Sequence, residues 1–229
     1  MTLAPEPRLI FDVPGGQLAL RATDLEVWAE HLDWCYRLMG IPRGGTIAAQ
    51  DFGSSPISFL GSCLLIPGLE TGVAERMDGR FICLDASPER VTLTPAVLAQ
   101  LAVDALIVRS DVFGLLDAEI ARKSPGGYPA NLRLVVAIDE NDTPIRGRAV
   151  WRHLLNVPAS MLLAPECPVC GGFHLRSGYY EVGAKGVVRN LRLPGTTPCC
   201  LPFAEIVAPG GCSVAPGDFR IVYIGTARG

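Results

Sequence analysis

The spacing of apolar side chains predicts a helix over residues 23–39, near the start of the chain. Apolar residues recur there every three or four positions, which places them on one helix face. Thr23 or Asp24 can cap the first turn. Gly40 stands where a left-handed residue ends many helices, and Pro42 cannot continue one. The pattern therefore predicts a helix with a defined start and a defined end.

Strand-like and helix-like segments then alternate up to about residue 158. Short apolar runs rich in β-branched or aromatic residues predict strands at residues 46–50, 80–84, 105–109 and 132–138. The segments between and after them predict helices at residues 57–69, 95–103, 111–122 and 146–155. Strands that alternate with helices form a mainly parallel sheet with helices on its faces, so the predicted fold class is α/β.

The composition and the apolar pattern of the chain change after about residue 158. Gly, Pro and Cys become frequent, and helical periodicity disappears. Short strands are predicted at residues 173–182, 186–193 and 219–224. We therefore expect two parts, an α/β core over residues 1–160 and a smaller β-rich subdomain over residues 161–229.

Composition indicates a folded chain and argues against two classes of partner. Apolar residues make up 49% of the chain and charged residues 19%, enough to bury a sizeable core. The net charge is −3 and no basic block is present, so nucleic-acid binding is not expected. The longest apolar run, residues 57–69, is shorter than the roughly 20 residues that a membrane span needs. A buried helix, and no membrane span, is expected there.

The eight cysteines are interpreted from the expected compartment. The N-terminus lacks the charged and apolar regions of a secretion signal, so a cytoplasmic location is expected. A reducing compartment disfavours disulfides. The cysteines are then either small buried apolar residues or metal ligands.

One cysteine–histidine cluster has the spacing of a metal site. Cys167 and Cys170 are separated by two residues, and His174 follows four residues later. Gly171 and Gly172 allow the backbone to fold so that the histidine reaches the same centre. Zinc favours four tetrahedral sulfur or nitrogen ligands in a closed structural site. The cluster therefore predicts a structural zinc ion with three local ligands.

Cys212, in a Pro-Gly-Gly turn, is the preferred fourth ligand, and Cys199 and Cys200 are its competitors. The alternative is that all these cysteines are apolar core residues. A catalytic zinc ion would need an open coordination position and a nearby acid or base. Glu166 is adjacent in sequence, but we expect it to be an ordinary surface carboxylate. His31 and His153 are isolated on predicted helices and carry no catalytic expectation.

The order of several segments resembles a known enzyme family. Residues 164–182 contain Glu-Cys, then Gly-Phe-His, then Tyr-Tyr-Glu-Val. Residues 23–45 resemble the helix and turn after that family's phosphate loop, and residues 212–225 resemble the cysteine turn and Arg-Ile segment that close its large domain. In these features the chain resembles the phenylacetate–CoA ligase-like branch of the adenylate-forming enzymes.

The resemblance implies a zinc site and accounts for its ligand set. In that branch the matching cysteines and histidine are thought to bind zinc. The family turn usually carries Cys-x-Cys, but Val214 occupies the second position here. Cys170 has no counterpart in the family pattern and can replace the missing ligand. The implied set is Cys167, Cys170, His174 and Cys212.

The nucleotide motifs implied by the resemblance are degraded. Residues 11–17 align with the phosphate loop but contain no Ser, Thr or Lys, and residues 154–158 lack the magnesium-binding Glu. Glu205 aligns near the ribose-binding segment, and Glu140 lies in an acidic loop that matches the turn beside the nucleotide. These two residues are the only nucleotide-side candidates. Residues 139–142 could alternatively hold a divalent ion. We expect the family's small C-terminal lid domain, with its lysine, to be absent, and we do not expect ATP and magnesium to bind.

These losses lead to an expectation about function. We expect a degenerate adenylate-forming-like protein that acts as a non-catalytic binding or accessory subunit, with no catalytic residue assigned. It would keep an acyl or aryl pocket and associate with a protein partner or with itself. The alternatives are an active acyl- or aryl-CoA ligase with a diverged nucleotide site or a separately encoded C-terminal domain, and a zinc-stabilised interaction module without a ligand pocket.

Overall fold

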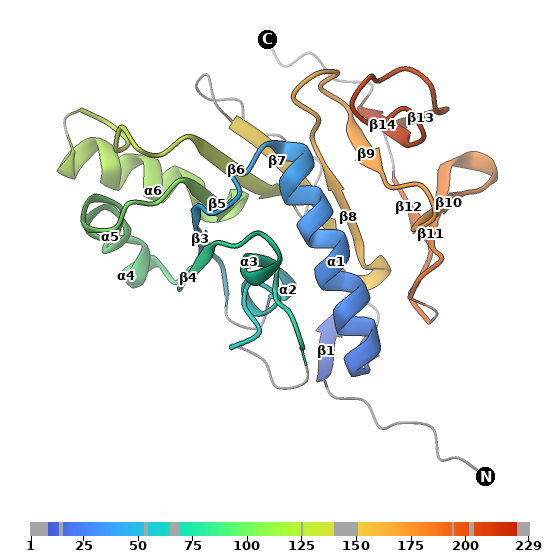
Figure 1. The fold of residues 1–229 in the computed structure, drawn as a ribbon, viewed down its shortest axis with the longest axis horizontal. Coiled ribbons are helices and arrows are strands. Elements are labelled where there is room, and N and C mark those ends of the chain that lie inside the picture. The colour runs from blue at the N-terminus through green and yellow to red at the C-terminus, as the bar shows by residue number, and fades with distance from the viewer. Residues whose placement is uncertain are drawn as a thin grey trace.

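A six-stranded sheet forms the centre of the protein, in the order β4-β3-β5-β6-β7-β8 (Figure 1). The computed structural model describes residues 9–13, 16–52, 55–64, 69–124, 126–139, 151–193, 195–201 and 204–223. The strands are β3 (Thr46–Gln50), β4 (Arg80–Leu84), β5 (Ala105–Arg109), β6 (Leu134–Asp139), β7 (Trp151–Val157) and β8 (Leu162–Pro165). All neighbouring pairs are parallel except β7 and β8. The predicted mixed α/β architecture with a mainly parallel sheet is confirmed.

Side chains of the central strands alternate between two cores. Ile47 and Ala49 of β3 belong to one apolar cluster, and Ala48 between them belongs to another. The first core packs against α1 (Ala22–Met39), α2 (Pro56–Phe59) and α3 (Val73–Arg76). The second packs against α4 (Pro88–Val91), α5 (Thr94–Gln100) and α6 (Ser110–Lys123). Helices therefore cover both faces, which explains why the strands are apolar throughout.

Helix α1 lies across the sheet in front of β8 (Figure 1). It begins one residue earlier than predicted, because Arg21 is the cap and its backbone N–H donates to the Asp24 carboxylate at 2.9 Å. It ends at the predicted place, where Gly40 adopts φ 87° and its N–H donates to Arg37 O at 3.1 Å. The amphipathic pattern and the glycine stop thus fix this helix.

His31 joins α1 to the sheet through a buried network. Its Nε2 lies 2.9 Å from the carbonyl oxygen of Leu163 on β8 and 3.0 Å from the hydroxyl of Tyr180. Its ring stacks between Trp34 and Tyr179, with centroid separations of 5.4 and 4.8 Å. The histidine is 2% exposed. It is a core residue that ties three elements together.

Two predicted helices are wrong. Residues 151–155, expected within a helix over 146–155, begin strand β7, and residues 140–150 lie outside the described part of the chain. Leu154 and Leu155 of β7 face different cores, so the strand is apolar on both sides and looks like a buried helix in sequence. His153 is accordingly on a strand.

The helix expected over residues 57–69 is also shorter than predicted. Helix α2 covers only Pro56–Phe59, turns follow to residue 64, and residues 65–68 are not described. A side-chain carbon on Gly61 would lie 2.3 Å from the Phe81 ring, so β4 packs directly on this backbone. The chain then doubles back, with Ala74 N–H donating to Gly61 O at 2.8 Å.

Three small antiparallel sheets complete the described fold. One is the hairpin of β1 (Leu9–Val13) and β2 (Gly16–Leu20). The second contains β10 (Tyr180–Val182), β11 (Val187–Asn190) and β12 (Cys199–Cys200), and the third contains β9 (Phe173–Leu175), β13 (Ala204–Val207) and β14 (Phe219–Tyr223). A third apolar cluster packs β7 and β8 against these last two sheets. Within the described residues, no helix is both long and apolar enough to cross a membrane.

Candidate metal centre

Cys167 and Cys170 lie in a tight turn that follows β8. Cys167 N–H donates to Gly172 O at 2.9 Å, and Gly171 N–H donates back to Cys167 O at 3.0 Å. Gly171 has φ +67°, a left-handed backbone conformation that residues other than glycine rarely adopt. Val169 N–H points at the Cys167 sulfur at 3.4 Å. The two glycines noted in the sequence therefore close the turn that brings both thiols to one side.

His174 enters the same site from β9. The residue pairs with Arg220 of β14 across the antiparallel ladder and is fully buried. Its Nε2 lies 3.4 Å from the Cys170 sulfur. The strand therefore fixes the backbone of the histidine, and the ring presents Nε2 to the thiols.

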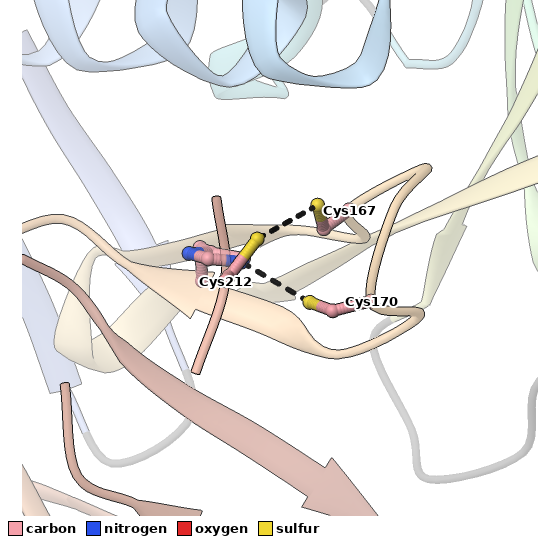
Figure 2. Close-up of side chains that lie close together, drawn as sticks. Cys167, Cys170 and Cys212 are labelled. Carbon is pink, nitrogen blue, oxygen red and sulfur yellow. Dashed lines mark hydrogen bonds between the residues drawn. The ribbon is translucent and has the colours of Figure 1, made fainter. Parts of the chain in front are cut away.

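Cys212 reaches the site from a separate segment, the turn that precedes β14. Its sulfur lies 3.7 Å from that of Cys167. Figure 2 shows the three labelled thiols pointing toward one another, with Cys167 and Cys170 on one turn and Cys212 on the other segment. Every cysteine of the cluster is free, so none of these contacts is a disulfide.

The spacing of the donor atoms fits a tetrahedral zinc ion. The sulfur atoms of Cys167, Cys170 and Cys212 and a ring nitrogen of His174 all lie within 4.8 Å of one another. Zn–S bonds of about 2.3 Å at tetrahedral angles separate two sulfurs by about 3.8 Å, and a sulfur and a nitrogen by about 3.6 Å. The distances of 3.7 Å between Cys167 and Cys212 and 3.4 Å between Cys170 and His174 are close to these edges.

Hydrogen bonds prepare the cluster for metal binding. The Ala215 N–H, helped by that of Val214 and opposed by burial, lowers the pKa of the Cys212 thiol to about 6. Burial opposes the charged form of His174, but the nearby Asp218 carboxylate and the Cys170 thiol outweigh it and raise its pKa to about 9. Both shifts favour the charged forms, a thiolate and an imidazolium, and a metal ion would displace the remaining protons on binding.

The pKa values of the two thiols in the other turn, Cys167 and Cys170, shift in opposite directions. Burial raises the pKa of Cys167. Burial acts the same way on Cys170, but hydrogen bonds from Gly172 N–H and His174 lower its pKa overall. The thiol next to the histidine is therefore the more easily ionised of the two.

The C-terminal half of α1 forms the floor of the site. Leu38 packs with Cys167 and Cys212 in a small apolar cluster, and Trp34 and Ala215 lie at its edge. Sequence reasoning missed these contacts, although Trp34 and Leu38 belong to a helix that it predicted. An apolar floor excludes water and strengthens the attraction between a cation and thiolates.

The competing cysteines lie elsewhere. Cys199 and Cys200 pair with Val188 and Val187 in the neighbouring sheet, and the metal-competent group does not include them. Cys199 is buried in the third apolar cluster, and Cys200 is exposed. The structure thus brings together the four preferred residues and neither competitor.

Of the two nucleotide-side candidates, the structure describes only Glu205, and the metal-competent group does not include it. Glu205 is exposed on β13, opposite Val222, and Glu140 lies outside the described residues. Residues 11–13 and 16–17, which align with a phosphate loop, are the end of β1 and the start of β2, and Gln17 Nε2 donates to the Asp12 carboxylate at 3.1 Å. The described part of this segment is paired strand.

Glu166, the acid considered as a partner of a catalytic metal, has another role. One of its carboxylate oxygens accepts the backbone N–H of His153 at 2.9 Å, which extends the pairing between the β7 and β8 segments. The carboxylate therefore acts in strand pairing.

Comparison with known proteins gives only weak matches. No protein-family profile and no curated protein matches the chain. Two solved structures of the amide bond synthetase McbA from Marinactinospora thermotolerans, one of them a point mutant, match with 15% identity and a TM-score of 0.39. The matches cover 71% and 70% of this chain but only 29% and 30% of the synthetase. The chain thus spans less than a third of those structures, and a likeness at this level does not assign it to a family.

Proposed function

We propose that the protein binds one zinc ion as a structural cofactor through Cys167, Cys170, His174 and Cys212. The observation that carries the proposal is the convergence of four donor atoms within 4.8 Å from two separate chain segments. Three thiols and one imidazole form a donor set that selects zinc among the common divalent ions. The bound ion would supply only coordination bonds that hold the two segments together.

The surroundings of the four residues favour a structural over a catalytic ion. Four protein donors fill a tetrahedral shell, so no position is left for a water molecule or a substrate. Cys167, His174 and Cys212 are buried. Glu166, the nearest acid in sequence, already accepts a backbone hydrogen bond. A closed, apolar-floored site suits an ion that stabilises the fold.

Metal analysis of the purified protein tests this proposal. One equivalent of zinc per chain is expected, and a Cys212→Ser variant should lose it. Cys200→Ser is the matched control, because Cys200 is an exposed cysteine on a different sheet. Co²⁺ substitution should give the absorption of a tetrahedral thiolate centre in the wild type and in the control. A wild-type protein that stays metal-free after incubation with zinc would overturn the proposal.

For the protein as a whole, we propose a non-catalytic binding or accessory role on an adenylate-forming-like fold. The sequence segments that resemble such enzymes include the zinc cluster, whereas the segment aligned with the phosphate loop lacks Ser, Thr and Lys. Asn156, in the region aligned with the magnesium-binding Glu, is buried on β7. A reaction that depends on phosphate and magnesium contacts loses most of its transition-state stabilisation without them.

Calorimetry with ATP and magnesium tests the second proposal. No heat of binding is expected with nucleotide concentrations up to the millimolar range. Release of pyrophosphate in the presence of carboxylic acids, or ATP binding at micromolar concentration, would instead favour an active acyl- or aryl-CoA ligase with a diverged site. A partner protein or a homo-oligomer is part of this proposal, and light scattering of the native protein measures the assembly directly.

A further inference from the structure

We propose that Asp218 is a positioning residue for the metal centre, holding the His174 ring in the tautomer that presents Nε2 to the ion. This inference rests on the proposed zinc site. It concerns a residue that has no ligand role and that lies in the segment between Cys212 and β14.

The geometry places the Asp218 carboxylate on the far side of the His174 ring. Oδ2 lies 3.5 Å from Nδ1, while Nε2, on the opposite side of the ring, faces the thiol of Cys170. The histidine is fully buried and Asp218 is 7% exposed. Among the described residues, Nδ1 makes no hydrogen bond of ordinary length, so this carboxylate is the acceptor that faces it. The separation is a few tenths of an ångström longer than a normal hydrogen bond.

Asp218 is itself held in place. Its Oδ1 accepts the backbone N–H of Ser177 at 2.8 Å, and its own N–H donates to Ala215 O at 3.3 Å. One carboxylate oxygen is therefore anchored, and the other remains directed at the histidine. The same short segment before β14 supplies both the Cys212 thiol and this carboxylate.

Metal binding makes this arrangement useful. An imidazole that donates its Nε2 lone pair to zinc must carry its proton on Nδ1, and a buried N–H without an acceptor is unfavourable. A carboxylate at Nδ1 fixes that tautomer, orients the ring and makes Nε2 a stronger ligand. Asp218 meets this requirement from the Nδ1 side of the ring, opposite the Cys170 thiol.

The added negative charge has a nearby counterion. Zinc with three thiolates and one neutral imidazole carries one negative charge, and Asp218 adds another. Arg220 pairs with His174 across the β9–β14 ladder, and its guanidinium lies against the backbone of Gly211, next to Cys212. Its positive charge offsets part of the repulsion.

The test compares Asp218→Asn and Asp218→Glu with a control, Glu181→Gln. Asparagine can still accept the Ser177 N–H but has no charge, whereas glutamate restores a carboxylate. Glu181 is exposed on another sheet. Zinc competition with a chromophoric chelator should show binding about 10- to 100-fold weaker for Asp218→Asn, partial recovery for Asp218→Glu, and no change for the control.

Nuclear magnetic resonance gives a second measurement, which would stay unchanged if Asp218 only stabilised the fold. In zinc-loaded wild-type protein, long-range ¹H–¹⁵N spectra should show His174 protonated at Nδ1, with that proton exchanging slowly, and Asp218→Asn should speed this exchange. Equal zinc affinity and equal exchange in wild type and Asp218→Asn overturn the inference while leaving the metal site intact. A wild-type protein that binds no zinc overturns the metal site and this inference with it.

Discussion

Replacing His31 by glutamine should remove a defined part of the protein's sensitivity to acid. Burial is the main cause that lowers the pKa of this imidazole to about 4, and the hydrogen bond to Leu163 O only partly opposes it. The folded protein therefore keeps His31 neutral at pH values where the unfolded chain, with a pKa of about 6.5, already binds a proton. Glutamine can keep a donor near the Nε2 position without titrating.

The sign and the size of this effect on the free energy of unfolding follow from proton linkage. Between pH 6.5 and about 4 the unfolded state holds one more proton at this residue, so stability falls as the pH falls. The slope is about 1.4 kcal/mol per pH unit over roughly 2.5 units, which gives a loss of about 3 kcal/mol that is complete near pH 4. Above pH 6.5 both states are neutral, and His31 contributes no pH dependence.

Urea unfolding measures this difference directly. Wild type and His31→Gln are compared at pH 7.5 and pH 4.5, both with a chelator and a reductant, so that contributions from metal and cysteines cancel. The wild type should lose about 2 to 3 kcal/mol more than the variant across this range. The variant should be less stable at pH 7.5, because it loses the stacking on Trp34 and Tyr179. Equal losses in the two proteins would refute the assignment of His31 as a neutral core histidine.

Three further predictions concern the metal and the packing. Removing zinc with a chelator should lower the melting temperature by roughly 8 to 16 °C if the ion is present at about 1,000 times its Kd, since such binding adds about 4 kcal/mol; an unchanged melting curve would contradict this. Gly61→Ala should destabilise the protein by about 1 to 3 kcal/mol in urea unfolding, because the new carbon meets the Phe81 ring. Gly114→Ala, in an open position on α6, should instead stabilise the protein by up to about 1 kcal/mol. The glycine prediction fails if the two changes have the same sign. Tyr180→Phe should cost about 1 to 3 kcal/mol by leaving the Leu163 N–H without its acceptor, and hydrogen exchange at that amide should accelerate; unchanged exchange would count against it.

The elements with a single clear pattern were predictable from sequence. Residues 46–50, 80–84 and 105–109 are strands with the predicted bounds, because short β-branched runs between turns have few alternatives. Helix α1 is also close to its predicted bounds. Residues 151–155 were not predictable, because a strand covered on both faces has no polar side that distinguishes it from a buried helix.

Some residues of the candidate site were likewise predictable from the sequence, and others were not. The local spacing of Cys167, Cys170 and His174 is visible in the sequence, since residues this close must lie near one another. Asp218 gives no such signal, because its position beside the His174 ring depends on the pairing of β9 with β14. Glu205 is a different case: the resemblance suggested a nucleotide-side role, the structure shows its side chain exposed on β13, and the role stays a prediction.

The two chain segments that meet at the cluster have a consequence for folding. His174 and Cys212 are separated by roughly forty residues, so an ion held by both would close a loop of that length. Like a disulfide, such a cross-link reduces the entropy of the unfolded chain, and for this loop length the chain-entropy description gives a stabilisation of about 4 kcal/mol. Three of the four ligands fall within eight consecutive residues, so the ion can bind this turn before Cys212 arrives. The ion would then act as a reversible cross-link that draws β14 into place.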